Sequence, residues 1–190
     1  IFGMINIIMK QVESVKPDYA AVAFDLKAPT FRHKMYDAYK AGRHAMPPEL
    51  AMQFPYAKKC ISALGIKVIE LEGYEADDII GTVSRICEEE KIECCVLTGD
   101  RDDLQLASSL THIHLVITRM GNTETTVYDD KLVFEKYGVT PSEFIDLKAI
   151  MGDSSDNIPG VKGIGEKTAE FYHKMNIYTV SDLLKHYPRD

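Results

Sequence analysis

Three short stretches of this 190-residue sequence, GYEADDIIG, LTGDRDDLQL and MGDSSDNIPG, each hold two or three acidic residues, and a fourth, YAAVAFD, ends in a single one. Carboxylates without accompanying His or Cys suit hard cations such as Mg²⁺ or Mn²⁺. Two such ions about 4 Å apart can hold a phosphodiester, activate a water and stabilise the leaving oxygen. The acids therefore predict metal-dependent phosphodiester hydrolysis. The eight candidate metal ligands are Asp25, Glu75, Asp77, Asp78, Asp100, Asp102, Asp153 and Asp156.

Each acidic group also has a purely structural interpretation. Acids in a first helical turn favour the helix dipole and cap free N–H groups, and Asp after a strand commonly makes a turn. Asp103, beside the third group, is expected to point elsewhere. Taken together the groups favour function, because several like charges at one sheet edge are costly unless cations neutralise them.

A basic segment with interleaved aromatic residues follows Asp25 directly. Such a segment suits a nucleic-acid strand, since cations pair with phosphates and rings stack on bases. A solvated surface loop is the alternative, and the position beside Asp25 favours nucleic acid. The cations are Lys27, Arg32, His33, Lys34, Lys40, Arg43 and His44, and the rings are Phe31, Tyr36 and Tyr39.

The stretch NIPGVKGIGEKTA, residues 157–169, predicts a tight glycine-rich loop that enters a helix at Glu166. Backbone N–H groups of such a loop, with the helix N-terminus, can face a phosphate. A simple turn between helices is the alternative, but three glycines exceed what a turn needs. The candidate contacts are Gly160, Lys162, Gly163, Gly165 and Lys167.

Alternating strands and helices must position these groups, which predicts an α/β fold with the acids at the carboxyl ends of the strands. An amphipathic helix opens the chain, and from about Asp129 only helices and the glycine-rich loop are expected. Gly121 and Asn122 are expected to form a turn between the last two strands. The expected strands are 19–25, 66–71, 92–100, 112–118 and 124–128, and the expected helices are 49–64, after Pro47 and Pro48, and 75–90.

The net charge of −7 is unusual for a nucleic-acid binder, which is commonly basic. The 29 acidic residues less the eight candidate ligands leave 21, against 22 Lys and Arg, so the excess matches the proposed metal site. The four cysteines are expected to be buried free thiols in a reducing cytoplasm. No run approaches the roughly 20 apolar residues of a membrane helix, so a cytoplasmic protein without a membrane partner is expected.

The motifs FDLKAPTFRHKMYDAYKAGR, GYEADDIIG, LTGDRDDLQL and MGDSSDNIPGVKGIGEKTA resemble, in order and spacing, those of the 5′ nuclease domain of bacterial DNA polymerase I, in the flap endonuclease superfamily. The resemblance implies a mostly parallel central sheet with helices on both faces, a helical arch and a helix-hairpin-helix subdomain. It also implies a 5′-3′ exonuclease or flap endonuclease acting in replication and repair, on DNA with 5′ flaps, nicks or 5′ ends.

The resemblance further implies two divalent ions, Mg²⁺ or Mn²⁺, the first near Asp25 and residues 75–78, the second near the other four acids. Lys40 matches a lysine that approaches the scissile phosphate; Arg43 and Arg32 match phosphate clamps, and Tyr39 a stacking platform. The glycine loop matches a duplex-binding hairpin, at which K⁺ is a candidate. Residues 1–138 would form the nuclease core with an arch at about 26–64, and residues 139–190 a helical DNA-binding subdomain.

Family members begin with a strand that carries an Asp, whereas this chain starts at the next helix. We therefore expect a monomeric fragment of a longer protein, in which a polymerase is a candidate to follow, with activity reduced or lost. A non-catalytic DNA-structure-binding module is the main alternative. A small-molecule phosphohydrolase is a weaker alternative, because it would not need the basic segment. The sequence does not distinguish a DNA-cleaving from an RNA-cleaving enzyme.

Overall fold

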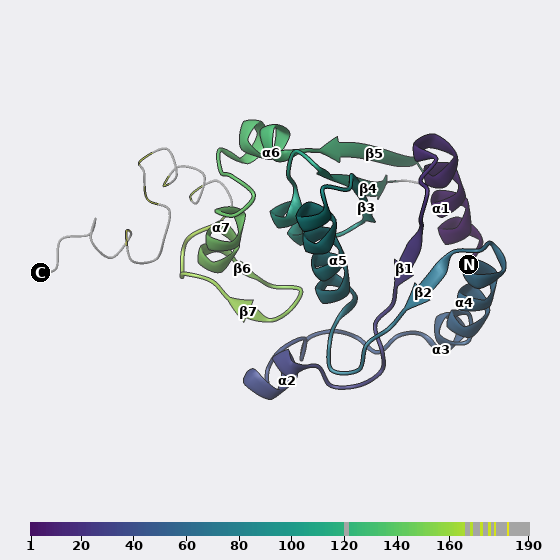
Figure 1. The fold of residues 1–190 in the computed structure, drawn as a ribbon. Helices are drawn as coiled ribbons and strands as arrows, with labels where there is room; N and C mark the ends of the chain where they lie inside the picture. Colours follow the sequence, from purple (N-terminus) through teal and green to yellow (C-terminus); the bar gives the residue numbers. More distant parts are fainter. Residues whose placement is uncertain are drawn as a thin grey trace, which may run out of the picture. The chain divides into compact units, whose positions relative to one another are not determined.

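The computed structural model describes residues 1–119 and 122–165, with the single positions 168, 172, 175, 177 and 182. The chain divides into two compact units. Unit 1 comprises Ile1–Asp37 and Arg43–Ile80, and unit 2 comprises Ala38–Gly42 and Gly81–Asp190. Figure 1 follows the helices and strands along the chain. No helix of the described residues is long and apolar enough to cross a membrane.

Unit 1 packs two helices, α1 (Phe2–Val15) and α4 (Phe54–Ala63), against the parallel pair β1 (Ala21–Ala23) and β2 (Lys67–Ile69). Both helices lie beside this strand pair in Figure 1. Apolar residues of α1 recur at helical spacing and cover a buried cluster of Phe24, Ile61 and Ile66. The predicted N-terminal helix and the first two strands are confirmed, with shorter strands than expected.

The stretch between the first strand and α4 differs from the expectation in two places. Thr30 and His33 form a capping box, which starts the short helix α2 (Phe31–Met35), a helix that was not among the expected ranges. The single helix expected over residues 49–64 is divided into α3 (Pro48–Ala51) and α4. Pro55 explains the division, because it lacks an N–H and its ring would clash with the carbonyl of Ala51.

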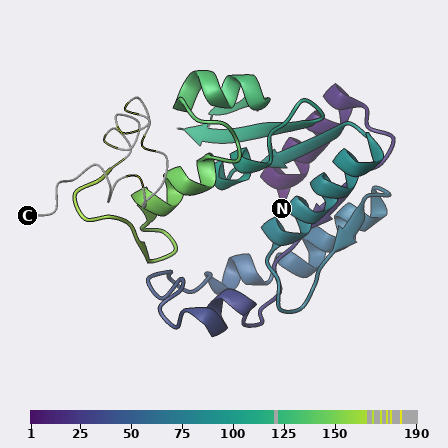
Figure 2. The same cartoon turned by 60° about the vertical axis from the view of Figure 1, so that its left-hand side comes forward.

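Helix α5 (Ala76–Glu90) begins in unit 1 and ends in unit 2. In unit 2, β3 (Cys94–Thr98) pairs in parallel with β4 (Thr111–Arg119), which pairs antiparallel with β5 (Asn122–Tyr128). Figure 2 shows β4 and β5 side by side as long strands. The α/β class is confirmed, and the described strands form sheets of two, three and two strands. Gly121 of the expected turn lies outside the described residues.

One face of β4 forms the core of the unit 2 sheet. Thr111, Ile113 and Leu115 are almost fully buried, while the alternating His112 and His114 lie half-buried on the other face. A six-residue 3₁₀ helix, η1 (Arg101–Leu106), follows β3 and buries Leu104. The end of β3 is therefore anchored at the point where the third acidic group begins.

After β5 come the helices α6 (Asp130–Tyr137) and α7 (Phe144–Met151). The expectation of only helices and a loop here was incomplete, because β6 (Gly152–Asp153) and β7 (Ile158–Pro159) form a short antiparallel pair. Two glycines permit the pairing: a Cβ on Gly152 would lie 2.2 Å from the Gly160 nitrogen, and one on Gly160 would lie 2.2 Å from the Met151 oxygen.

The cysteines are free thiols, as expected, but they are not all buried. Cys60 and Cys95 are exposed, and Cys87 and Cys94 are partly buried. Cys95 is exposed because successive strand residues point to opposite faces, and its neighbour Val96 takes the buried face.

Candidate active site

Arg32 forms ion pairs with two acids at the start of α5, Glu75 and Asp78, all within unit 1. Its guanidinium donates to both oxygens of Asp78, at 2.7 and 2.8 Å, and lies 3.6 Å from Glu75 Oε2. Such a two-bond arrangement is the strongest common form of ion pair. Arg32, expected as a phosphate clamp, is therefore occupied by carboxylates in this structure.

Asp25 reaches the same helix end from the segment after β1. Its Oδ1 accepts a hydrogen bond of 2.6 Å from the Ala76 nitrogen, and Asp78 Oδ2 accepts one of 2.9 Å from the Glu75 nitrogen. These acids thus satisfy N–H groups that the first helical turn leaves without partners. Asp77 lies in that first turn. Three of the acids expected at a first metal, Asp25, Glu75 and Asp78, thus lie at the start of α5, and the fourth, Asp77, belongs to its first turn.

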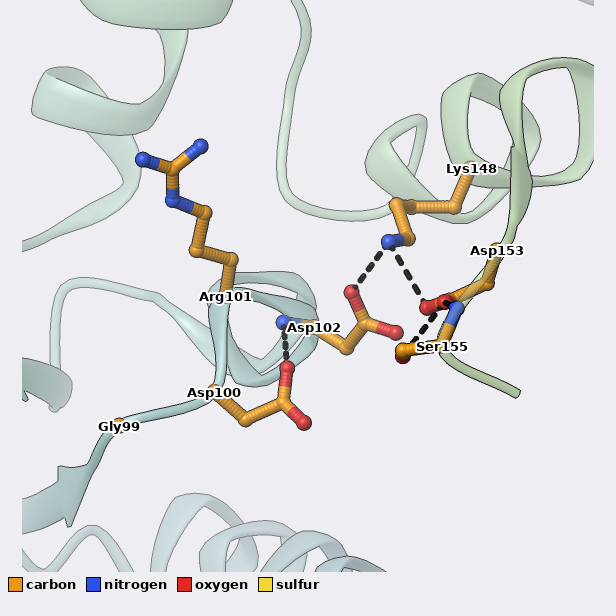
Figure 3. Close-up of a pocket in the computed structure, with 7 residues that line it drawn as sticks. All are labelled: Gly99, Asp100, Arg101, Asp102, Lys148, Asp153 and Ser155. Carbon is orange, nitrogen blue, oxygen red and sulfur yellow. Dashed lines mark hydrogen bonds and ion pairs between the residues drawn. The ribbon is translucent and has the colours of Figure 1, made fainter. Parts of the chain in front are cut away.

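Unit 2 contains a hollow of ≈ 500 Å³ beyond the end of β3. Figure 3 shows carboxylates from two chain segments facing one another across it. On one side, Asp100 Oδ1 accepts a bond of 2.9 Å from the Asp102 nitrogen and so caps η1. The lining residues are Gly99, Asp100, Arg101, Asp102, Lys148, Asp153 and Ser155.

On the other side of the hollow, the short strand pair β6–β7 and its turn hold Asp153. Its Oδ1 accepts bonds from the Ser155 nitrogen at 2.8 Å and the Ser155 hydroxyl at 2.6 Å. Partial burial alone would raise the pKa of Asp153, but these bonds, with the nearby Lys148 charge, lower it to about 2. Asp153 is therefore an anion at neutral pH.

Lys148, from α7, links the two sides of the hollow. Its Nζ lies 2.8 Å from Asp102 Oδ1 and 3.3 Å from Asp153 Oδ2 (Figure 3). Burial opposes the charged form of Lys148, yet the two carboxylates raise its pKa. Burial raises the pKa of Asp102, and the charges of Asp100 and Asp153 add to this while Lys148 opposes it. Sequence reasoning missed Lys148, whose one signal was a cation in the largely apolar stretch FIDLKAIM just before the fourth acidic group.

Asp103 does not line the hollow, in agreement with the expectation that it points elsewhere. Only 3% of its surface is exposed, and its Oδ2 lacks a hydrogen-bond partner among the described residues. Burial raises the pKa of Asp103, and the neighbouring Asp100 and Asp102 add to the effect. The third acidic group therefore divides into two acids at the hollow and one in the core.

Asp156, the last acid, contacts the segment Ala38–Gly42. The Tyr39 hydroxyl donates to Asp156 Oδ2 at 3.1 Å, and the Lys40 nitrogen donates to the Asp156 carbonyl at 2.9 Å. Only 6% of Tyr39 is exposed, so its ring faces are covered by protein. This differs from the expected stacking platform, because a base can stack only on an accessible face.

The remaining DNA-binding candidates are surface residues or lie outside the described ranges. Arg43, in unit 1, and Lys162, Gly163 and Gly165, in unit 2, are exposed. Gly163 has a φ of 87°, a conformation that favours glycine. Gly160 serves the close approach to Met151, a structural need in addition to the expected phosphate contact. Lys167 and the helix start expected at Glu166 lie outside the described residues.

Comparison with known proteins gives two family matches. Residues 1–138 match the family described as 5′-3′ exonuclease, N-terminal resolvase-like domain, and residues 139–185 match 5′-3′ exonuclease, C-terminal SAM fold. The chain belongs to the 5′-3′ exonuclease family. The resemblance drawn from its four motifs is thereby confirmed.

Relatives of this exonuclease chain include DNA polymerase I of Bacillus subtilis (strain 168), 48% identical over 169 residues, or 89% of this chain and 19% of that protein. DNA polymerase I of Caldicellulosiruptor bescii is 45% identical over 170 residues, 90% of this chain and 20% of that protein. The exonuclease chain thus spans about a fifth of the length of these curated relatives.

A solved structure of T5 5′-exonuclease, described as having divalent metal ions (zinc) bound, matches 98% of this chain and 70% of its own with a TM-score of 0.77. The sequence identity of 24% supports the fold alone. The α/β architecture of the exonuclease chain is therefore shared with that protein.

The carboxylate oxygens of the exonuclease chain are the donor type that hard cations prefer. The Lys148 ammonium already lies between Asp102 and Asp153 at ion-pair distance from both. Among the described residues no group of three His, Cys, Asp or Glu has the arrangement of a finished metal site. A divalent ion at the hollow would therefore take over carboxylates that a protein cation now holds.

Proposed function

We propose that this chain is a divalent-metal-dependent 5′ nuclease module that hydrolyses phosphodiester bonds of DNA with 5′ flaps, nicks or 5′ ends. The observation that carries the proposal is the hollow of unit 2, where Asp102 and Asp153, from two segments, both lie at ion-pair distance from the Lys148 ammonium. Membership of the 5′-3′ exonuclease family supports the same reaction. We propose that this module acts in replication and repair, as part of a longer protein in which a polymerase follows the nuclease. The relatives named DNA polymerase I support this context.

Two sets of carboxylates would hold the divalent ions, Mg²⁺ or Mn²⁺. Asp100, Asp102, Asp153 and Asp156 are proposed as one set in unit 2, and Asp25, Glu75, Asp77 and Asp78 as the other in unit 1. Bound ions of this kind polarise the phosphate and lower the pKa of a bound water. The T5 protein described with bound divalent ions supports the proposal through its shared fold.

Protein cations would bind and orient the phosphates of the DNA. We assign this role to Lys40, whose Nζ lies 4.0 Å from Asp156 Oδ2, and to the exposed Arg43. Arg32 can join them only when a phosphate competes with Asp78 for its guanidinium. Electrostatic contacts of this type supply most sequence-independent affinity for DNA.

The glycine-rich loop is proposed as the second DNA contact, with Lys162, Gly163, Gly165 and Lys167 facing the backbone of a duplex. The exposure of the first three supports this, and K⁺ is the candidate ion for the loop. We also propose a division into a core of residues 1–138 and a DNA-binding subdomain of residues 139–190. The boundary between the two family matches supports that division.

A DNA-binding fragment without catalysis is the second candidate. It is favoured by the two protein cations, Arg32 and Lys148, that neutralise acids in this structure. In such a fragment the acids would serve folding, and DNA binding would need no divalent ion.

Cleavage of a 5′-labelled flap duplex tests the proposal, with Mg²⁺, with Mn²⁺ and with EDTA. Asp100→Asn is the informative variant, because the amide keeps an oxygen to cap η1 while the ligand charge is lost. We expect a rate loss of roughly 100-fold or more, which corresponds to the several kcal/mol that metal coordination supplies. Asp18→Ala, which removes an exposed acid outside the site, is the matched control.

The outcomes separate the two candidate functions. Cleavage that is lost with EDTA and with Asp100→Asn, but kept with Asp18→Ala, establishes the nuclease. Binding of the flap without cleavage under any metal condition establishes the DNA-binding fragment. Thermal unfolding of each variant confirms that the compared chains are folded.

A further inference from the structure

The segment Ala38–Gly42 belongs to unit 2, although the residues on both sides of it belong to unit 1. Three hydrogen bonds fasten it to the turn that carries the last acids. Two come from the segment, from the Tyr39 hydroxyl and the Lys40 nitrogen to Asp156. The third comes from the turn: Asn157 Nδ2 donates to the Ala38 carbonyl at 2.9 Å. Asp156 and Asn157 of the turn are thus hydrogen-bonded to three consecutive residues of the segment, Ala38–Lys40.

Backbone conformation indicates that these bonds determine the shape of the segment. Lys40 has a φ of 57° and Asn157 a φ of 59°. Asn adopts this left-handed region with little difficulty, whereas for Lys it is unfavourable. Such a conformation persists only where surrounding contacts enforce it. The Lys40 amide bonded to Asp156, with Ala38 held by Asn157, supplies that enforcement.

We propose that Asn157 is a positioning residue that places Lys40 beside Asp156. The Lys40 side chain is only 18% exposed, with its Nζ 4.0 Å from Asp156 Oδ2 and 4.9 Å from the centre of the Tyr39 ring. Its ammonium is therefore held over a short range rather than moving freely in solvent. The consequence for catalysis rests on the proposed function, in which Lys40 orients the phosphate.

Loss of the Asn157 amide leaves every cation of the basic segment in the chain. DNA affinity, which depends on those charges, should therefore change little. The orientation of Lys40 should change, because one of the three bonds that enforce its backbone conformation is gone. Positioning errors of this kind reduce the rate of the bound complex more than they weaken binding.

Two substitutions isolate the amide. Asn157→Asp keeps the size and the tolerance for positive φ but replaces the donor by a carboxylate oxygen. Asn157→Gly keeps the backbone conformation and removes the side chain without adding charge. Asn122→Asp, at an exposed position of β5, adds the same charge away from the site and is the matched control. Cooperative unfolding of each variant within about 6 °C of the parent, the shift that a loss of about 1.4 kcal/mol produces in a chain of this size, shows that the fold is intact.

The first readout is hydrogen exchange of the Lys40 amide, followed by NMR, which needs neither metal nor DNA. We expect exchange at Lys40 to be roughly tenfold faster in both Asn157 variants, the factor for a net hydrogen-bond contribution of about 1.4 kcal/mol. It should stay at the parent value in Asn122→Asp. Unchanged exchange in both Asn157 variants overturns the proposal.

The second readout is steady-state cleavage of the flap duplex, with kcat expected to fall roughly tenfold and KM to stay within about twofold. A tenfold rise in KM at constant kcat, or faster exchange with no change in either constant, overturns the positioning role. If the parent chain cleaves nothing, the proposed function fails, and the exchange experiment by itself decides whether Asn157 places Lys40.

Discussion

Replacing Lys148 by methionine is expected to tighten the binding of a divalent cation at Asp102 and Asp153. The ammonium lies 2.8 Å from one carboxylate and 3.3 Å from the other, in the space between them. A divalent ion that binds both acids must first separate these ion pairs. Methionine keeps the length and apolar stem of lysine but has no charge, so the variant removes this competition.

The size of the effect follows from the two distances. In bulk water, Coulomb's law gives about 1.5 kcal/mol for the shorter pair and about 1.3 kcal/mol for the longer. The side chains are between 20% and 39% exposed, so screening and side-chain entropy reduce the net value to about 1–2 kcal/mol for both pairs. Divalent-ion affinity should therefore rise roughly 5- to 30-fold, and the metal-free chain should lose about 1–2 kcal/mol of stability.

Mn²⁺ binding, measured from the EPR signal of free Mn²⁺, tests this without any cleavage reaction. Lys58→Met is the matched control, because Lys58 also has a 28% exposed side chain in an ion pair, with Glu70 of unit 1. The control should lose a similar single ion pair while Mn²⁺ affinity stays at the parent value. An affinity in Lys148→Met equal to or weaker than that of the parent would refute competition between the lysine and the metal.

Two further predictions concern stability. Partial burial, with a smaller contribution from His112, lowers the pKa of His114 in the folded chain. Protonation of His114 therefore favours the unfolded chain. The free energy of unfolding is unaffected by this group above about pH 6.5 and decreases as the pH falls through the lowered pKa. His114→Gln should therefore lose less stability than the parent in urea unfolding between about pH 7 and pH 5, and equal losses would contradict the reasoning. Gly152→Ala should cost at least about 3 kcal/mol, because φ is 74° and ψ is 179° and the new Cβ would meet the Gly160 backbone. Gly3→Ala, in α1 with nothing within 4 Å, is the control and should be neutral or stabilising.

Local patterns in the sequence were sufficient for most elements of the fold. The apolar spacing of α1, the start of α5 at GYEADD and the alternation along β4 each depend on neighbours within one element. The division between α3 and α4 was missed, although the sequence signals it through Pro55, which forbids a continuous helix there. The β6–β7 pair could not be predicted from the sequence, because it depends on the close approach of the Gly152 and Gly160 backbones across a turn.

The sequence by itself determined the chemistry available to this protein. It contains carboxylates in four motifs, a basic segment beside one of them and a glycine-rich loop, in the order of the 5′-3′ exonuclease family. These are properties of residue type and spacing, so they can be read before the chain is folded.

Only the tertiary structure decided which charges meet. Arg32 and Asp78 are 46 residues apart, and Tyr39 and Asp156 are 117 apart, yet both pairs are hydrogen-bonded. Lys148 lies between two acids that come from different segments of unit 2. No local pattern specifies such pairs, because ion pairs and hydrogen bonds act over a few ångströms of space and packing of distant elements sets those distances.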